Sequence, residues 1–250
     1  LHKKLVVTAK KWNILKHDQE SVRTFADELR GPPLVAALLL ARCYDTNAKA
    51  DEFLNPSLSH LHDPFLLKVM REAVDRIQEA IVHREKILVW GDYDVDGTTG
   101  TVLLRRAFKV LGVESEFHVP NRFTEGYGVN IPALKAAQER GVSLVITVDC
   151  GIRSFEPLEW ARDQGLDVIV TDHHLSDESK GNPPALAVVN PNQLGCEYPD
   201  KHLAGVGVAF KLATALLTKA GLEHEIPGFL KIAAIGTVAD VMDLTGENRA

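Results

Sequence analysis

Apolar positions in the first third of the chain recur at helical spacing. Short helices are expected at 21–31 and 34–42, and from Pro64 to Ile81 apolar residues return every three or four positions. Ser21 is the expected N-cap of the first helix, because a serine hydroxyl can accept a hydrogen bond from the first turn. The pattern predicts a helical region over residues 1–85, packed on the rest of the protein.

From Lys86 the pattern changes to short apolar runs that alternate with helical segments. Strands are expected at 86–91, 114–119, 143–149, 167–171 and 186–190, with helices at 98–111, 130–140 and 154–164. Such alternation is typical of a parallel sheet covered by helices on both faces. The sequence predicts an α/β fold over 86–250, with a doubly wound, mainly parallel five-stranded sheet flanked by helices.

Acidic and histidine residues follow three of the expected strands. They are Asp92, Asp94 and Asp96 after the first strand, Asp149 after the third, and Asp172, His173 and His174 after the fourth. In a flavodoxin-like order 2-1-3-4-5 these strands are neighbours, and ligands bind beyond their carboxyl ends. We therefore expect these side chains to converge at one edge of the sheet.

The acidic run after the first strand has other interpretations. An EF-hand needs a glutamate at its twelfth position, which is Leu103 here, and a P-loop needs a lysine where Gly97 is followed by Thr98. A solvated turn remains open for this stretch alone, as does a helix N-cap for Asp149 alone. Convergence of all these groups favours a metal centre, because clustered carboxylates repel one another unless a cation neutralises them.

A further carboxylate, Asp240, follows the apolar helical run 229–238, where it must be paired or bind metal. Oxygen ligands with imidazoles and no thiolate favour Mn²⁺ or Mg²⁺ over zinc. Five or more carboxylates suit two ions, an arrangement used in phosphoester hydrolysis. Two divalent cations, Mn²⁺ or Mg²⁺, are the expected cofactors.

Composition narrows the class of protein. Of the 250 residues, 45% are hydrophobic and 25% are charged. No stretch approaches 18 consecutive apolar residues, and the first residues lack the apolar core of a signal peptide. A cytoplasmic protein without a membrane segment is therefore expected. Cys43, Cys150 and Cys196 suggest neither a disulfide framework nor a zinc site. The net charge of −6 argues against a broad basic surface for nucleic acid, but not against a local groove.

Two of the motifs, Asp172-His173-His174 and the run 92–97, resemble those of the DHH phosphoesterase superfamily. Within it the likeness is to the RecJ-type single-stranded-DNA exonucleases, and it covers most of the chain. The stretches that carry it are 91–97, 119–128, 148–152, 170–174, 190–192, 203–210 and 236–240.

The resemblance implies roles for the metal ligands. One ion would be held by Asp96, Asp149, His173 and Asp240. Asp149 would bridge to a second ion bound by Asp94, with Asp92 as a substitute for the histidine that other members carry at the position of Trp90. His174 would face the scissile phosphate, and Asp172 would orient the histidines.

Two glycine-containing segments are expected to contact the substrate phosphate. Arg122, Gly126 and Tyr127 follow the second strand, and Gly205 and Gly207 open a helix that runs to about Lys219. The alternatives are a salt-bridged loop arginine for the first segment and close packing against the sheet for the second.

The implied function is a 5′-to-3′ exonuclease that releases nucleoside 5′-monophosphates from single-stranded DNA in repair and recombination. Single-strand-binding protein and a helicase are the implied partners of the full-length protein. The alternatives are a phosphoesterase of small substrates (oligoribonucleotides, cyclic dinucleotides or pyrophosphate) and a non-catalytic replication scaffold. The chain departs from the family at Met242-Asp243, and it ends at Ala250 where the family continues into a second domain and an OB-type module, so a catalytic-core fragment is expected.

Overall fold

The computed structural model describes residues 17–177 and 179–250 and divides into two compact units, with the boundary between Ser57 and Leu58. The part of the predicted helical region that covers residues 1–16 lies outside the described residues. A domain boundary at residue 85, and packing of the whole region 1–85 on residues 86–250, remain predictions.

The smaller unit contains α1 (Gln19–Leu29), α2 (Pro33–Leu40) and α3 (Asn47–Leu54). These helices pack around Phe25, Ala36, Leu39 and Ala50. The cap of α1 differs from the prediction, because Asp18 is the N-cap and its carboxylate accepts from the Ser21 amide at 2.8 Å. Ser21 lies within the first turn.

The larger unit is built on a five-stranded parallel sheet in the order β2-β1-β3-β4-β5, which confirms the predicted doubly wound fold. The strands are β1 (Lys86–Gly91), β2 (Glu116–His118), β3 (Val142–Val148), β4 (Asp167–Thr171) and β5 (Ala187–Val189). Gly91 pairs with Val148, and Val148 with Thr171, so β1, β3 and β4 end level with one another. The residues after these three strands therefore begin at the same edge.

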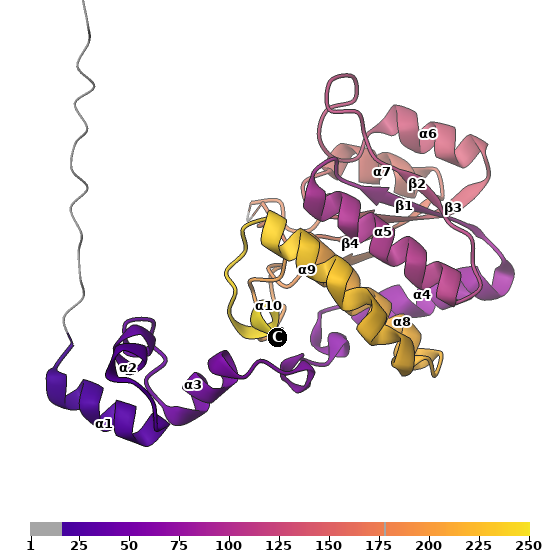
Figure 1. Ribbon diagram of the computed structural model, residues 1–250. Coiled ribbons are helices and arrows are strands. Elements are labelled where there is room, and N and C mark those ends of the chain that lie inside the picture. Colours follow the sequence, from indigo (N-terminus) through magenta and orange to yellow (C-terminus); the bar gives the residue numbers. More distant parts are fainter. Residues whose placement is uncertain (1–16, 178) are drawn as a thin grey trace, which may run out of the picture. The chain divides into compact units, whose positions relative to one another are not determined.

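Helices cover both faces of the sheet (Figure 1). On one face lie α4 (Met70–His83), α5 (Val95–Val110), α8 (Gly205–Lys219) and α9 (Leu230–Ala239), and on the other lie α6 (Ile131–Glu139) and α7 (Phe155–Asp163). The short elements η1 (Leu58–His60), η2 (Pro64–Leu66), η3 (Glu223–Phe229) and α10 (Gly246–Arg249) complete the unit. None of the helices in the described ranges is both long and apolar enough to cross a bilayer.

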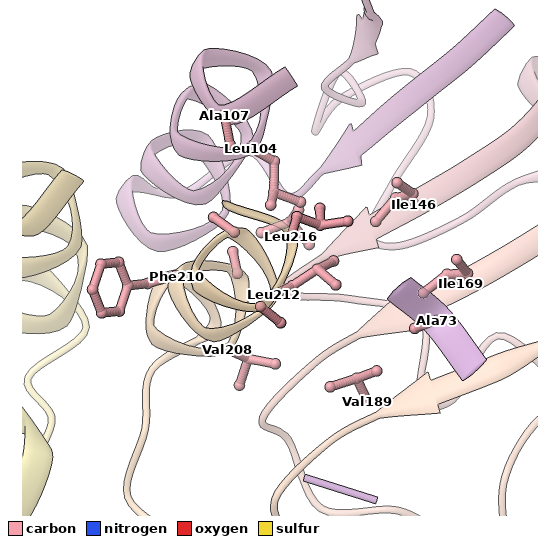
Figure 2. Close-up of a cluster of buried hydrophobic side chains, with 14 of the residues drawn as sticks. Ala73, Leu104, Ala107, Ile146, Ile169, Val189, Val208, Phe210, Leu212 and Leu216 are labelled. Atoms are coloured by element: carbon pink, nitrogen blue, oxygen red, sulfur yellow. The ribbon is translucent and has the colours of Figure 1, made fainter. Parts of the chain in front are cut away.

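The main core lies between the sheet and α5 and α8. Figure 2 shows Leu104 of α5 and Leu212 and Leu216 of α8 beside Ile146 and Ile169 from the strands. Alternate strand residues point to the opposite face, where Leu88, Trp90 and Val145 pack with α6 and α7. This packing holds the first turns of α5 and α8 beside the carboxyl edge of the sheet.

A buried ion pair joins α8 to α10. Lys211 and Glu247 are 2% and 6% exposed, and the Lys211 ammonium donates to the Glu247 carboxylate. The Tyr198 hydroxyl donates to the same carboxylate at 2.6 Å. Burial lowers the pKa of Lys211, which the neighbouring carboxylate opposes. The pair anchors the segment that follows Asp240.

Candidate metal centre

The three aspartates after β1 occupy different positions at the start of α5. Asp92 is buried in the turn. Asp94 is the N-cap of α5, and its Oδ1 accepts from the Gly97 amide at 2.9 Å. Asp96 lies in the first turn and is 1% exposed. The helix therefore begins three residues earlier than predicted, because Asp94 supplies the cap.

Asp96 points at the start of α8. Its two carboxylate oxygens accept from the amides of Gly205 and Val206, each at 2.7 Å. The free amides of a helix N-terminus favour an anion in this place. These two bonds hold α8 against α5 at the edge of the sheet.

Asp149 directly follows β3 with a backbone φ of 61°, in the left-handed region that non-glycine residues rarely adopt. Its side chain is 2% exposed and lies against α8. A Cβ added to Gly205 would lie 2.5 Å from the Asp149 Cβ, so only glycine permits this approach. Strained backbone of this kind is concentrated at functional sites.

Asp172 holds the two histidines that follow it. Its Oδ1 accepts from the amides of His173 (2.8 Å) and His174 (3.1 Å) and lies 2.8 Å from His174 Nδ1, while its Oδ2 accepts from the Ile152 amide at 3.0 Å. Burial alone would raise the pKa of Asp172, but its bonds with His174 and these amides hold it below the ordinary value. The same contact with Asp172 raises the pKa of His174.

The end of α9 brings in Asp240. Asp240 Oδ2 lies 3.7 Å from His173 Nε2, and Asp96 Oδ2 lies 3.9 Å from the same nitrogen. The approach of α9 depends on Gly236, where a Cβ would lie 2.4 Å from Thr99 Oγ1 and 3.0 Å from Asp96 Oδ1. The extra carboxylate of this segment, Asp243, is exposed and lies 4.0 Å from His202 instead.

All six predicted metal ligands come together. Their ligand atoms form overlapping groups, each within 4.8 Å, made of Asp96, His173 and Asp240, of Asp149, His173 and His174, and of Asp92, Asp94 and Asp149. Asp149 belongs to two of these groups. The described residues thus provide three overlapping groups of potential ligands, which are linked through His173 and Asp149.

The buried, mutually repelling carboxylates of the cluster favour a bound cation. Burial, with repulsion from Asp96 and Asp94, raises the pKa of Asp149 to about 10, and burial raises the pKa of Asp96 to about 6 and that of Asp92 above its ordinary value. Within the described residues, Oδ1 of Asp92 and Oδ1 of Asp149 are buried and accept no hydrogen bond. A buried carboxylate oxygen without a donor is costly unless a cation binds it.

The donor set also fits Mn²⁺ or Mg²⁺. It consists of carboxylate oxygens and imidazole nitrogens, while the buried Cys150 thiol points to the Trp90 carbonyl. Adjacent ligands of an octahedral ion lie about 3 Å apart, close to the 3.2 Å between Asp149 Oδ1 and His173 Nε2. Trp90 packs in the apolar cluster, and the centre of its ring lies 4.2 Å from that of His118.

The loop after β2 brings aromatic side chains to the centre. The Tyr127 hydroxyl donates to the Asp149 carbonyl at 3.4 Å, and its ring lies 6.4 Å from the rings of Tyr93 and His174. The Arg122 guanidinium lies 5.4 Å from the Tyr93 ring centre, and Gly126 is exposed with φ 81°. A cavity of about 470 Å³ opens beside His174, between Tyr127 and the start of α7.

The expected phosphate contact of the two glycines of α8 stays a prediction. Gly205 and Gly207 are both buried, and the Gly205 amide already donates to Asp96. Gly205 therefore permits the close packing that was the alternative. The sequence analysis assigned no role to Asn190 and Asn192, although both donate hydrogen bonds to the backbone of the histidines. The available signal was the motif 190–192, because it follows β5, the strand next to β4.

Comparison with known proteins identifies the family. The model of the DHH family, N-terminal domain, matches residues 86–237. The chain belongs to the DHH family. The matched range includes every predicted metal ligand of this DHH chain except Asp240, which lies just beyond it.

The DHH chain has relatives among curated proteins and solved structures. It is 45% identical to the single-stranded-DNA-specific exonuclease RecJ of *Bacillus subtilis* over 98% of the chain and 30% of that protein, and 38% identical to the *Escherichia coli* RecJ over 94% and 42%. A structure of exonuclease RecJ bound to manganese matches with a TM-score of 0.68 at 40% identity, over 77% of this chain and 47% of that one. RecJ of *Thermus thermophilus* with Mn²⁺ matches with a TM-score of 0.75 at 33% identity, over 94% and 32%. The chain spans between 30% and 42% of the length of these two curated relatives.

Proposed function

We propose that this DHH chain is the N-terminal catalytic part of a metal-dependent exonuclease that removes nucleoside 5′-monophosphates from the 5′ end of single-stranded DNA. The observation that carries the proposal is the chain of three overlapping ligand groups, linked through His173 and Asp149, at the carboxyl edge of the sheet. The similarity to RecJ exonucleases over nearly the whole chain supports single-stranded DNA as the substrate.

In this proposal Asp96, Asp149, His173 and Asp240 hold one divalent cation, and Asp92, Asp94 and Asp149 hold a second. Mn²⁺ or Mg²⁺ bound there would lower the pKa of a water nucleophile and stabilise charge on the phosphoryl oxygens. *Thermus* RecJ has been solved with each of these ions, which supports the choice.

The remaining residues bind and orient the substrate. His174 Nδ1 is engaged by Asp172, which leaves Nε2 as the nitrogen available to a phosphate oxygen. The raised pKa of His174 favours the cationic ring, which attracts that oxygen. Tyr93 and Tyr127 offer ring faces on which bases of a single strand can stack, and Arg122 can pair with a phosphate. The cavity beside His174 has room for the terminal nucleotide.

We place this activity in DNA repair and recombination in the cytoplasm, with single-strand-binding protein and a helicase as partners of the full-length protein. A small-substrate phosphoesterase and a non-catalytic scaffold are the competing functions. The extent of the similarity to RecJ argues against the first, and the intact set of mutually repelling carboxylates argues against the second.

The test is digestion of single-stranded DNA labelled at either end, with Mn²⁺, by this chain and by a chain extended to the length of the RecJ relatives. We expect early release of mononucleotides from the 5′ end, lost in Asp149→Ala and retained in Asp243→Ala, the exposed acid outside the cluster. Cleavage of dinucleotides alone would favour the small-substrate function. Mn²⁺ binding without any hydrolysis by the extended chain would favour the scaffold.

A further inference from the structure

The loop after β5 carries two asparagines that contact the backbone of both histidines in the metal centre. Asn190 is fully buried, and its Nδ2 donates to the His174 carbonyl at 2.9 Å. Asn192 Nδ2 donates to the His173 carbonyl at 2.7 Å. The two asparagines are also joined to each other, because the backbone N–H of Asn192 donates to Asn190 Oδ1 at 2.7 Å.

These contacts complete the restraint that Asp172 begins. Asp172 accepts the backbone N–H groups of His173 and His174, and the asparagines bind the carbonyls of the same two residues. Both backbone polar groups of each histidine are therefore held by a side chain. The restraint is possible because β4 and β5 are neighbours, with Thr171 paired to Val189, so their ends reach the same edge.

Asn192 also connects the backbone of His173 with the segment that supports Asp96. The same Nδ2 lies 3.2 Å from the Lys201 carbonyl, in the segment that leads into α8. The first amides of α8 hold Asp96, while His173 lies at the end of β4. Asn192 thereby ties the backbone of one ligand to the segment that supports another.

The chemistry of these positions requires a short side chain with an N–H donor. A leucine at either position would leave a histidine carbonyl without its donor, and an aspartate would turn a carboxylate oxygen toward that carbonyl. Asn190 must in addition offer an acceptor to the backbone N–H of Asn192, and its side-chain amide carries the N–H donor and the oxygen acceptor on separate atoms.

We propose that Asn190 and Asn192 are positioning residues of the metal centre, which fix the His173-His174 backbone and so aim the His173 ring at the cation. The proposal rests on the metal role proposed above. Groups that orient a metal ligand from behind typically change metal affinity by about 10–100-fold when they are removed. A residue that serves only the fold would change stability without changing affinity.

The experiment measures the dissociation constant of Mn²⁺ by isothermal titration calorimetry, and the midpoint of thermal unfolding in EDTA, for Asn190→Ala and Asn192→Ala. Gln193→Ala is the matched control, because Gln193 is a buried amide of the same loop that donates to the Val188 carbonyl and not to a histidine. The half-buried Asn192 provides a variant that folds even if the fully buried Asn190 does not tolerate replacement.

We expect a dissociation constant raised at least about tenfold in Asn192→Ala, and a value within twofold of wild type in Gln193→Ala despite a lower unfolding midpoint. Equal affinity in Asn192→Ala and wild type would overturn the positioning role and leave the proposed function standing. An equal loss in Gln193→Ala would also overturn it, because the effect would then follow stability. A wild-type protein that binds no Mn²⁺ would instead refute the proposed function, and the positioning role with it.

Discussion

Replacement of Asp149 by asparagine is expected to stabilise the metal-free protein while it removes metal binding. Burial and repulsion by Asp96 and Asp94 raise the pKa of Asp149 from 3.8 to about 10. Asparagine has nearly the same shape without the charge, and it tolerates the left-handed backbone (φ 61°) better than most residues do. Loss of the buried charge therefore favours the folded state of Asp149→Asn, and the substitution adds no backbone strain.

The size of the gain follows from proton linkage. Below pH 3.8 the carboxyl group is protonated in the folded and unfolded protein alike, so its ionisation does not change the free energy of unfolding. As the pH rises the unfolded protein ionises freely and the folded protein does not, so stability is lost progressively until about pH 10. At roughly 1.4 kcal/mol for each pH unit above 3.8, the penalty removed by the substitution is at most about 4 kcal/mol at pH 7 and about 2 kcal/mol at pH 5.

The assay is urea unfolding followed by circular dichroism, with EDTA at pH 5 and pH 7 and then with Mn²⁺. Asp149→Asn should exceed wild type in free energy of unfolding in EDTA, by more at pH 7 than at pH 5. Excess Mn²⁺ should stabilise wild type, by about 2.7 kcal/mol at 100 times the dissociation constant, and Asp149→Asn much less. Asp243→Asn, at an exposed acid, is the control and should match wild type throughout. A metal-free Asp149→Asn protein no more stable than wild type at pH 7 would refute the reasoning.

Three further substitutions test the surroundings of the centre. Gly205→Ala places a Cβ 2.5 Å from the Asp149 Cβ, so α8 must move away from Asp149. Calorimetry should then show that the affinity for Mn²⁺ is reduced roughly tenfold. An unchanged affinity would contradict the close approach of Gly205 to Asp149. Glu247→Ala leaves the buried Lys211 ammonium without its partner and should cost about 3–5 kcal/mol in urea unfolding, whereas a loss below about 1 kcal/mol would mean that water replaces the carboxylate. Leu104→Ala in the core of Figure 2 should cost about 2–5 kcal/mol, and a changed Mn²⁺ affinity would contradict the separation of core from centre.

Local patterns were sufficient to predict most of the sheet. β1 and β4 have the predicted bounds, because a buried strand between neighbours is a continuous apolar run with abrupt ends. β2 and β5 are shorter than predicted, as Glu116–His118 and Ala187–Val189, because an edge strand has a neighbour on one side only and its ladder ends sooner. The predicted helix from Pro64 begins at Met70, since Val69 adopts a left-handed backbone and separates it from η2.

The part of the candidate site that directly follows the strands was predictable from the sequence. Aspartates and histidines after β1, β3 and β4 had to meet once those strands were neighbours, and they do. The role of Gly205 was not predictable, because a helix N-terminus can receive any anion and the one present is Asp96, from a helix more than a hundred residues earlier. Asp240 joins the site through the packing of α9 on α5, which no local pattern specifies.

The alternation of strands and helices follows from the sequence alone, as do the parallel sheet and the metal-binding atoms at its carboxyl edge. Those features depend on periodicity and on residue type, which are local and can be read along the chain. Other features are seen only in the folded protein: which carboxylates lie together, the left-handed backbone of Asp149 against Gly205, and the bonds from Asn190 and Asn192 to the histidines. These features arise where distant segments pack within a few ångströms of one another, and that distance depends on the close packing of the whole core.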